Sequence, residues 1–318
     1  MRRRDFAAFI ALGALPGAAL GQRMHRLAVL IHGPQQAQAG RFEALRAGLK
    51  ERGYVEGRDH VVSVRWNEAG LDRLPTLAAE LLGEKPDLFA CGPVLAAAAV
   101  HGVTRDVPIV AMWGAGLVKT GLAKSFARPG GNVTGLETQT EDLIPKHLEL
   151  LRTIAPRVSR VAVLNTGKYL FHEEGWRAAA EASRALRLEL TDVRVAAPAD
   201  LGKLARTGCN GLYVMPDPQL VNWRTQIIAE AARLHWPAIY PQQEFSREGG
   251  LASYSASFDD LCRRAAGYVD RILKGAKPAE LPIELASKFD LVIDLRTAGE
   301  LGLKISDAVL ARADQVIR

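Results

Sequence analysis

The sequence is poor in the residues that build metal sites and disulfide frameworks. It contains three cysteines and seven histidines in 318 residues. Cys91, Cys209 and Cys262 lie far apart, are odd in number and form no CxxC pair, so they indicate neither a zinc site nor a disulfide framework. We expect each to be a small buried apolar residue. The histidines form no HxxxH or HExxH pattern, so we expect no metal.

Motifs of nucleotide-binding proteins and of common enzymes are also missing. HGP at residues 32–34 stands where a GxGxxG turn would follow the first strand. GAGLVKT at residues 114–120 approaches a P-loop, but Val118 occupies the position of its second glycine. No GxSxG turn occurs, and the adjacent Asp259 and Asp260 fit the capped start of a helix. We therefore predict no catalytic residue and no cofactor.

No apolar run reaches the roughly 20 residues that a membrane-spanning helix needs. The apolar run at residues 6–20 is short, follows three arginines and ends in ALG. This pattern predicts a cleaved signal peptide over residues 1–21 with Gln22 as the mature start, and hence a periplasmic protein. The alternative is a cytoplasmic tail. RRDF at residues 3–6 matches the twin-arginine export pattern in part, which leaves the export route open.

Positive charge is modest and scattered. The formal net charge is +6, and removal of residues 1–21 takes away three positive charges and one negative charge and leaves +4. No lysine-rich run or basic–aromatic interleaving remains, so we expect no nucleic-acid partner. The apolar content of 48% and charged content of 24% are typical of a soluble globular protein. The length suits two domains.

Apolar strands alternate with helical spacing in two successive series. Parallel strands that alternate with helices build doubly wound sheets, so we predict an α/β fold of two doubly wound parallel-sheet lobes joined by a multi-segment hinge. The predicted strands are 26–31, 61–66, 87–91 and 108–112 in the first series, and 160–164, 189–193, 211–215, 237–240 and 289–295 in the second.

Two segments rich in glycine interrupt the alternation. RPGGNVTG at residues 128–135 is either an ordinary surface turn or the first crossing between lobes. GGLASY at residues 249–254 favours the crossing, because a chain that leaves a lobe and returns must cross at least twice. We assign residues 22–131 and 254–280 to an N-terminal lobe and residues 132–253 and 281–318 to a C-terminal lobe, with the lobe of the last segment left open.

Ligands of doubly wound sheets bind beyond the carboxyl ends of the strands. This rule selects a set of residues in the predicted turns at the ends of the strands. Four residues of this set, two of them glycines, would supply hydrogen bonds to a carboxylate. Asp217 would accept from an ammonium or hydroxyl group, or else is a turn residue between two prolines. The three aromatic residues either pack against a ligand or belong to the cores. The predicted ligand-binding residues are His32, Gly33, Gly92, Pro93, Trp113, Asn165, Thr166, Asp217, Tyr240 and Tyr254, of which Gly33, Gly92, Asn165 and Thr166 are the carboxylate donors.

A series of short motifs runs through the chain in a fixed order. They are GYVEG at 53–57, ARPGGNVTG at 127–135, GGLASY at 249–254, ILKGAKP at 272–278, LP at 281–282 and RAD at 312–314. With these motifs the chain resembles the type I periplasmic substrate-binding proteins of ABC transporters, in the subgroup that includes tryptophan- and tyrosine-binding proteins. The resemblance covers nearly all of the mature chain. It implies a monomer whose lobes close on a small carboxylate-bearing, amino-acid-like or aromatic ligand and deliver it to an ABC permease.

This chain departs from the family pattern at three places. GAG at residues 114–116 replaces a frequent DPV, Pro93 replaces a hydroxyl residue, and Asp294 replaces an asparagine. Because the first two lie in the predicted cleft, the ligand of a relative cannot be transferred to this chain. Two alternatives stay open, a ligand-sensing receptor of the same fold and an α/β enzyme. The enzyme would need a titratable pair in the cleft, where the predicted turns supply Asp217 without a clear partner.

Overall fold

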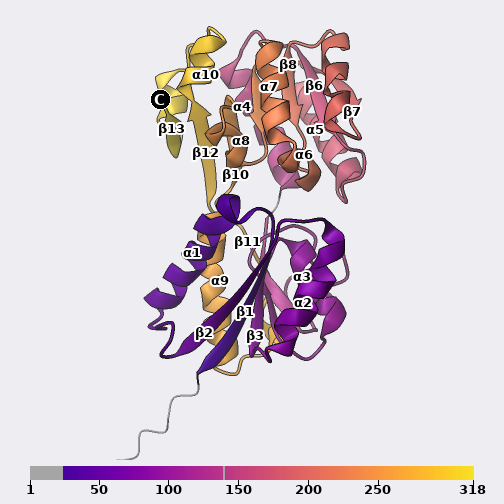
Figure 1. The fold of residues 1–318 in the computed structure, drawn as a ribbon. Coiled ribbons are helices and arrows are strands. Elements are labelled where there is room, and N and C mark those ends of the chain that lie inside the picture. The colour runs from indigo at the N-terminus through magenta and orange to yellow at the C-terminus, as the bar shows by residue number, and fades with distance from the viewer. Residues whose placement is uncertain (1–23, 139) are drawn as a thin grey trace, which may run out of the picture.

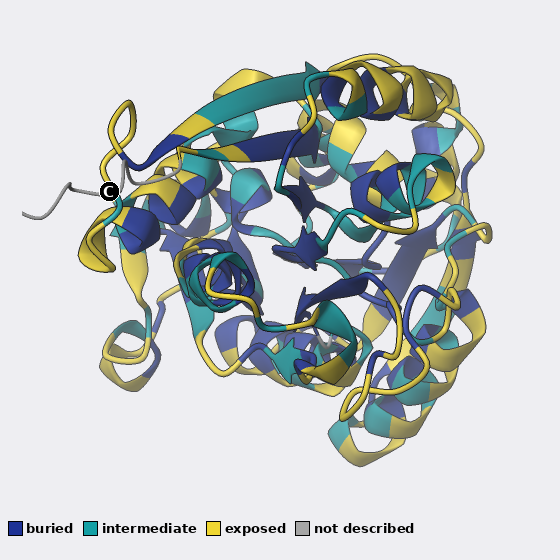
Figure 2. Cartoon of the chain, turned by 90° about the horizontal axis from the view of Figure 1, so that it is seen from below, coloured by how far each residue is buried: buried dark blue, intermediate teal, exposed yellow. Residues whose placement is uncertain are grey.

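The computed structural model describes residues 24–138 and 140–318, which form two lobes stacked end to end (Figure 1). The predicted signal peptide lies outside the described residues. Each lobe has a central sheet with helices on both faces, as predicted. The inner strands of each sheet are buried, the edge strands are partly exposed, and the outer faces of the helices are exposed (Figure 2).

The first sheet has six strands in the order β11-β5-β4-β3-β1-β2, all paired in parallel. The buried apolar run of β1 fits a strand that is covered on both faces. Alternate residues of β1 point to opposite faces, with Val29 in one core and Leu30 in the other. The strands are β1 (His25–His32), β2 (His60–Asn67), β3 (Leu88–Gly92), β4 (Ile109–Ala111), β5 (Val133–Glu137) and β11 (Glu284–Leu285).

Four helices cover the first sheet. Helices α1 (Gln35–Glu51) and α9 (Phe258–Leu273) pack together on one face, and α2 (Leu74–Gly83) and α3 (Val94–Val103) cover the other. Helix α9 comes from the far end of the sequence, yet it supplies a large part of the first-lobe core. Two short 3-10 helices, η1 (Leu71–Arg73) and η4 (Pro278–Glu280), lie in the connections of this lobe.

The second sheet has seven strands in the order β13-β12-β10-β9-β8-β6-β7. Its pairs are parallel except β10 with β12. The first five strands of each lobe follow the same spatial order, although the halves share no sequence repeat. The strands are β6 (Arg160–Asn165), β7 (Glu189–Arg194), β8 (Gly211–Val214), β9 (Ala238–Tyr240), β10 (Ala252–Ala256), β12 (Phe289–Asp294) and β13 (Gln315–Ile317).

Helices cover both faces of the second sheet as well. One core includes residues of α4 (Ile144–Ile154), α5 (His172–Leu186), α10 (Leu295–Glu300) and α11 (Asp307–Leu310). The other includes residues of η3 (Pro198–Arg206), α6 (Pro218–Asn222), α7 (Arg224–Arg233) and α8 (Gln243–Arg247). The 3-10 helix η2 (Glu141–Leu143) precedes α4.

The chain crosses between the sheets three times: after β5, after β10 and after β11. The backbone N–H of Ala286 donates to the carbonyl oxygen of Glu137 at 3.0 Å, and that of Ser257 donates to Lys288 at 2.9 Å. These bonds hold the three crossing segments side by side. The two lobes are therefore joined by three short connections.

The segment 128–135 is not itself a crossing. Residues 133–135 belong to β5, which pairs with β4, and Gly130 donates its N–H to Ala279 within the first lobe. Residues 254–256 likewise remain in the second sheet through β10, and residues 284–285 belong to the first sheet through β11. Strand pairing therefore moves each of the expected lobe boundaries by a few residues.

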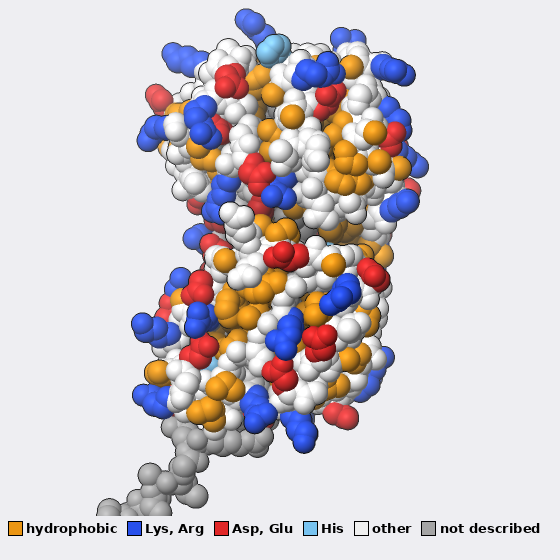
Figure 3. All heavy atoms as spheres, viewed as in Figure 1, with side chains coloured by type: hydrophobic (Ala, Val, Ile, Leu, Met, Phe, Trp, Pro, Cys, Tyr) orange, Lys and Arg blue, Asp and Glu red, His pale blue; other side chains and the backbone are white. Residues whose placement is uncertain are grey.

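The three cysteines are buried and unpaired, as expected. Among residues 24–138 and 140–318, no helix combines the length and apolar character needed to cross a bilayer. Basic and acidic side chains are interspersed over the face shown in Figure 3.

Candidate functional site

A cavity of about 720 Å³ lies between the two lobes. Its first-lobe wall is built by residues at or after the ends of β1, β2, β3, β4 and β5, and its second-lobe wall by residues that follow β6, β7 and β8. The strands β1 and β3, and β6 and β8, are the neighbours at which the strand order reverses, the place where open α/β sheets bind ligands. The volume fits a small molecule. We call this cavity the cleft.

Four of the predicted site residues line the cleft. His32 ends β1 and Pro93 follows β3 in the first lobe, and Thr166 and Asp217 follow β6 and β8 in the second. They therefore stand at corresponding positions of the two sheets. A ligand contact from these four residues stays a prediction, but their side chains are placed where it requires them.

The three predicted aromatic platforms lie outside the cleft wall. Trp113 is buried in the first-lobe core, with its ring edge-to-face with Phe258 at 6.5 Å between centroids. Tyr240 is fully buried in the second-lobe core and stacks on Phe245 at 4.7 Å. Tyr254 is half-buried, and its ring packs against His147 and Phe289. For Trp113 and Tyr240 the structure selects the core alternative.

Three of the four predicted carboxylate donors, Gly92, Gly33 and Asn165, contact other parts of the protein. Gly92 lies under the indole of Trp113, where an added Cβ would be 2.3 Å from the ring. The N–H of Gly33 donates to the carbonyl oxygen of Asn67 at 3.0 Å. The amide of Asn165, which is buried, donates to Asp192 at 2.6 Å.

Three aromatic side chains that the sequence reasoning missed line the second-lobe wall of the cleft: Tyr169, Phe171 and Trp223. The rings of Tyr169 and Phe171 are 5.6 Å apart. Both lie in the turn that starts at Asn165. Extending the set of predicted site residues further along that turn would have included them. Trp223 follows helix α6, and nothing in the sequence pattern marks it.

Asp217 is the N-cap of α6 and is only 6% exposed. One carboxylate oxygen accepts from the backbone N–H of Gln219 at 2.8 Å, and the other accepts from the hydroxyl of Thr166. The Thr166 oxygen in turn accepts from the N–H of Lys168 at 3.2 Å. Capping and the bond to Thr166 therefore fix the carboxylate of Asp217 at the cleft wall.

Two more carboxylates lie close behind the cleft. Glu137 accepts from the backbone N–H groups of Gly116 and Leu117 at 2.7 and 3.1 Å, and burial raises its pKa. Burial and the neighbouring carboxylates of Asp142 and Glu137 raise the pKa of Glu141 to about 7. The hydroxyl of Tyr169 donates to Glu141 at 3.5 Å. Burial, and then the charges of Glu141, Asp217 and Glu137, raise the pKa of Tyr169.

His32, the last residue of β1, contributes a polar side chain to the first-lobe wall. Its Nδ1 atom is 3.1 Å from the amide nitrogen of Asn67, which also donates to the carbonyl oxygen of Gly70. Burial lowers the pKa of His32, so its ring is neutral at pH 7. The same Nδ1 atom is 3.2 Å from the backbone carbonyl oxygen of Asn67, so it can accept from the Asn67 amide or donate to the Asn67 carbonyl, depending on the tautomer of the ring.

Ion pairs join the lobes at two places. Arg41 of α1 pairs with Glu244 of α8, and its guanidinium lies 4.0 Å from the ring centroid of Phe258. Lys119, in the turn after β4, pairs with Glu174 of α5 and lies 4.4 Å from the ring centroid of Phe171. The first pair is buried and the second is partly exposed.

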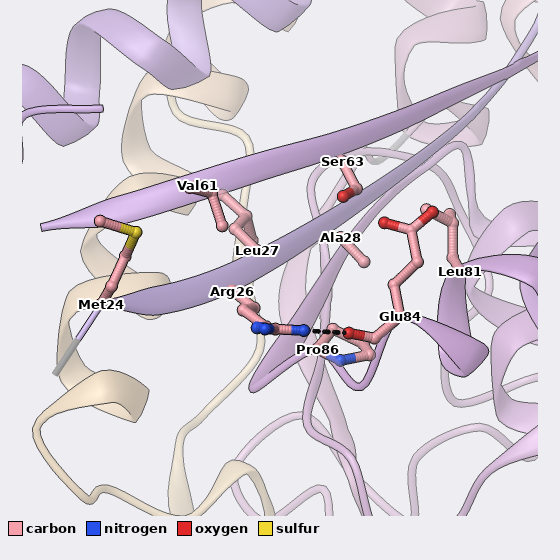
Figure 4. A pocket seen from close by; sticks show the side chains of 9 residues that line it. All are labelled: Met24, Arg26, Leu27, Ala28, Val61, Ser63, Leu81, Glu84 and Pro86. Atoms are coloured by element: carbon pink, nitrogen blue, oxygen red, sulfur yellow. Dashed lines mark hydrogen bonds between the residues drawn. The ribbon is translucent and has the colours of Figure 1, made fainter. Parts of the chain in front are cut away.

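A second hollow, of about 290 Å³, lies on the first lobe alone (Figure 4). It is found near the start of β1 and β2, where Arg26 donates to the carbonyl oxygen of Glu84 at 2.8 Å. The carboxyl ends of those strands are at the cleft, so this hollow is remote from the expected ligand position. Among the described residues, no group of three His, Cys, Asp or Glu side chains is placed to hold a metal ion.

Comparison with known proteins agrees with this architecture. Residues 27–317 match the family model described as ABC transporter substrate binding protein. A tyrosine-binding protein of Clostridioides difficile (strain R20291) is 23% identical over 264 residues, which are 80% of this chain and 74% of that protein.

Solved structures share the fold. The ABC domain in complex with L-Trp from Streptococcus pneumonia has a TM-score of 0.82 at 22% identity, over 93% of this chain and 100% of that one. The ligand-free, open structure of a substrate-binding protein with adhesive properties from Clostridium difficile has a TM-score of 0.74 at 18% identity, over 92% and 99%. The match over residues 27–317 shows that the chain belongs to the ABC transporter substrate-binding protein family.

Proposed function

We propose that this substrate-binding protein binds a small aromatic, amino-acid-like ligand in the cleft. The observation that carries the proposal is the composition of the second-lobe wall, where three aromatic side chains line the same cavity as the buried residue Asp217. Aromatic rings pack well against a flat apolar ligand, and a fixed carboxylate orients a polar end. Two of the proteins similar to this chain are a tyrosine-binding protein and a domain solved in complex with L-Trp.

The ligand is enclosed when the lobes close about the three crossing segments. Each lobe has its own cores, and the crossing segments are short and bonded to one another. Such an arrangement supports a rigid-body hinge motion, in which a few connecting residues absorb the change in backbone angles. The ligand then contacts both walls at once and stabilises the closed state.

The protein works in the periplasm as a monomer and delivers its ligand to an ABC permease, without chemical turnover. The charged and apolar regions within residues 1–21 support export by a cleaved signal peptide. Membership of a family of binding proteins supports delivery rather than catalysis.

The test is calorimetry and thermal unfolding of the chain from Gln22 onward with L-tryptophan, L-tyrosine, L-phenylalanine, L-leucine and arabinose. A ligand at about 100 times its dissociation constant adds roughly 2.7 kcal/mol of stability. We expect this stabilisation from one or more of the aromatic amino acids. Stabilisation by leucine or arabinose alone would contradict the aromatic ligand, and release of a new product detected by mass spectrometry would contradict a pure binding function.

A further inference from the structure

We propose that Gly116 and Lys119 of the first lobe hold the ring of Phe171 in the second lobe, and that this contact sets how long an aromatic ligand stays bound. The inference rests on the proposed function, because Phe171 is one of the three aromatic side chains of the cleft wall. The described lining of the cleft includes Phe171 but neither Gly116 nor Lys119. The two are therefore positioning residues, which act on the ligand through Phe171.

Gly116 lies against the Phe171 ring. An added Cβ at Gly116 would be 2.9 Å from Cζ and 3.2 Å from Cε2 of Phe171, and 3.3 Å from a methyl carbon of Leu170. Glycine permits this close approach of backbone and ring, and its φ of +91° is one that other residues rarely adopt. Gly116 belongs to the first lobe and Phe171 to the second, so the contact exists only while the lobes are together.

The backbone of Gly116 is fixed within its own lobe. Its N–H donates to a carboxylate oxygen of Glu137 at 2.7 Å, and the N–H of Leu117 donates to the other oxygen at 3.1 Å. The carbonyl oxygen of Gly116 accepts from the hydroxyl of Thr120 at 2.6 Å. The surface that meets Phe171 is thus organised by first-lobe bonds alone, and a preorganised surface loses little freedom when the contact forms.

Lys119 reaches the same second-lobe turn from the other end of its own turn. Its ammonium nitrogen lies 4.4 Å from the centroid of the Phe171 ring, a position in which the ring attracts a cation. It also donates to the carbonyl oxygen of Leu170 at 3.1 Å and pairs with Glu174 of α5. One first-lobe side chain therefore contacts three positions of the segment that carries Phe171.

These contacts have a consequence for the release of a ligand. A ligand that packs against the cleft wall meets a Phe171 ring that the first lobe holds in place. Release requires the lobes to separate, and separation breaks the contacts of Gly116 and Lys119 with the second lobe. Loss of either contact should therefore speed dissociation more than it slows association.

The first test compares two glycines of the same turn. Gly116→Ala and Gly121→Ala both place alanine at a positive φ, of +91° and +75°, but the Cβ added at Gly121 meets no atom within 4 Å. The probe is L-tryptophan, followed by calorimetry and by stopped-flow tryptophan fluorescence. We expect Gly116→Ala to weaken binding about 10-fold or more, chiefly through faster dissociation, and Gly121→Ala to change it by less than about 3-fold.

The second test removes the charge of Lys119. Lys119→Met keeps an unbranched apolar stem at a partly exposed site, so it keeps the test decisive even if Gly116→Ala does not fold. We expect dissociation of L-tryptophan to become about 3-fold faster or more. The matched control is Lys146→Met, because Lys146 pairs with Glu149 inside α4 at similar exposure and touches no other lobe. This control should leave the dissociation rate unchanged.

A double-mutant cycle with Phe171→Leu shows whether Gly116 acts through the ring. Leucine lacks the outer ring atoms that the new Cβ would meet, so in the Phe171→Leu background Gly116→Ala should weaken binding by less than about 3-fold. A merely structural effect would instead be the same in both backgrounds. Urea unfolding of all variants measures loss of folding separately from loss of binding.

Equal effects of Gly116→Ala and Gly121→Ala, equal losses in the two Phe171 backgrounds, or an unchanged dissociation rate in Lys119→Met would overturn the inference. Each of these results leaves the aromatic ligand intact, because the wild type still binds it. If the wild type binds none of L-tryptophan, L-tyrosine and L-phenylalanine, the proposed function is wrong and the inference falls with it.

Discussion

The buried ion pair between Arg41 and Glu244 should contribute strongly to the stability of the two-lobe arrangement. The two side chains are 5% and 11% exposed, and one oxygen of Glu244 already lacks a partner. Replacing Arg41 by methionine keeps an apolar stem against the Phe258 ring but leaves the carboxylate of Glu244 buried alone. Removal of one partner of a buried pair costs about 3–5 kcal/mol. We expect this loss in the free energy of unfolding.

The assay is a double-mutant cycle in urea, followed by circular dichroism and tryptophan fluorescence. The single variants are Arg41→Met and Glu244→Met. The double variant replaces both charges by apolar groups, so it should cost much less than the sum of the single changes. Glu51→Met is the control, because Glu51 pairs with Arg263 at a site where both side chains are 50% exposed. An exposed pair of this kind contributes about 0–1 kcal/mol.

Small losses in the single variants, below about 1 kcal/mol, together with additive losses in the double variant, would refute this reasoning. That result would mean that water screens the Arg41–Glu244 pair, and hence that the lobes are not held as closely there as the structure shows.

Two further predictions concern the cores of the lobes. In α1, Gly48→Ala should destabilise the protein by about 1–3 kcal/mol, because the new Cβ would lie 2.4 Å from the carbonyl oxygen of Arg263. Gly40→Ala in the same helix meets no atom within 4 Å and should stabilise by about 0.5–1 kcal/mol, so equal effects in urea unfolding would contradict the close α1–α9 contact. In the second lobe, burial lowers the pKa of His147 to about 4, below the value of 6.5 in the unfolded chain. The unfolded state then binds more protons between these values, so His147 should remove up to about 3 kcal/mol of stability as the pH falls from about 6.5 to about 4. His147→Gln should lose this contribution. The raised pKa of Glu141 changes the stability with pH in the opposite direction, but Glu141 is present in both the wild type and His147→Gln. Identical pH profiles of the free energy of unfolding, measured by chemical denaturation of the two proteins, would therefore refute the prediction.

The lobes and most of their strands could be predicted because each strand carries its own signal. β1 and β6 are continuous apolar runs, which is the local pattern of a strand buried on both faces. β5 and β10 were missed because glycine and proline near them suggested breaks. Gly135 lies inside β5, and an added Cβ would be 2.1 Å from the carbonyl oxygen of Ala111. There glycine permits a close approach of two strands, which depends on a non-local contact that the sequence does not display.

The site could be predicted in part, and for a topological reason. The strand-end rule selected His32, Pro93, Thr166 and Asp217, which lie at or just after the ends of the strands that flank the reversal of strand order and line the cleft; their contact with a ligand stays a prediction. Tyr240 is the last residue of β9, which lies farther from that reversal, and it is packed into the core. Which strand is adjacent to which becomes known only when the sheet is assembled, so the sequence could not separate these cases.

The three crossing segments have a consequence for the order in which the protein can fold. Helix α9 completes the core of the first lobe against α1, but it is synthesised after nearly the whole second lobe. A chain ending before residue 258 would leave the apolar side of α1 uncovered, and it would also lack β12 and β13 of the second sheet. Neither lobe is therefore built from one contiguous stretch of the chain, and neither can complete its fold before the other has been synthesised in large part. The strands made first belong to a core that is closed only when helix α9, in the last fifth of the chain, has been synthesised.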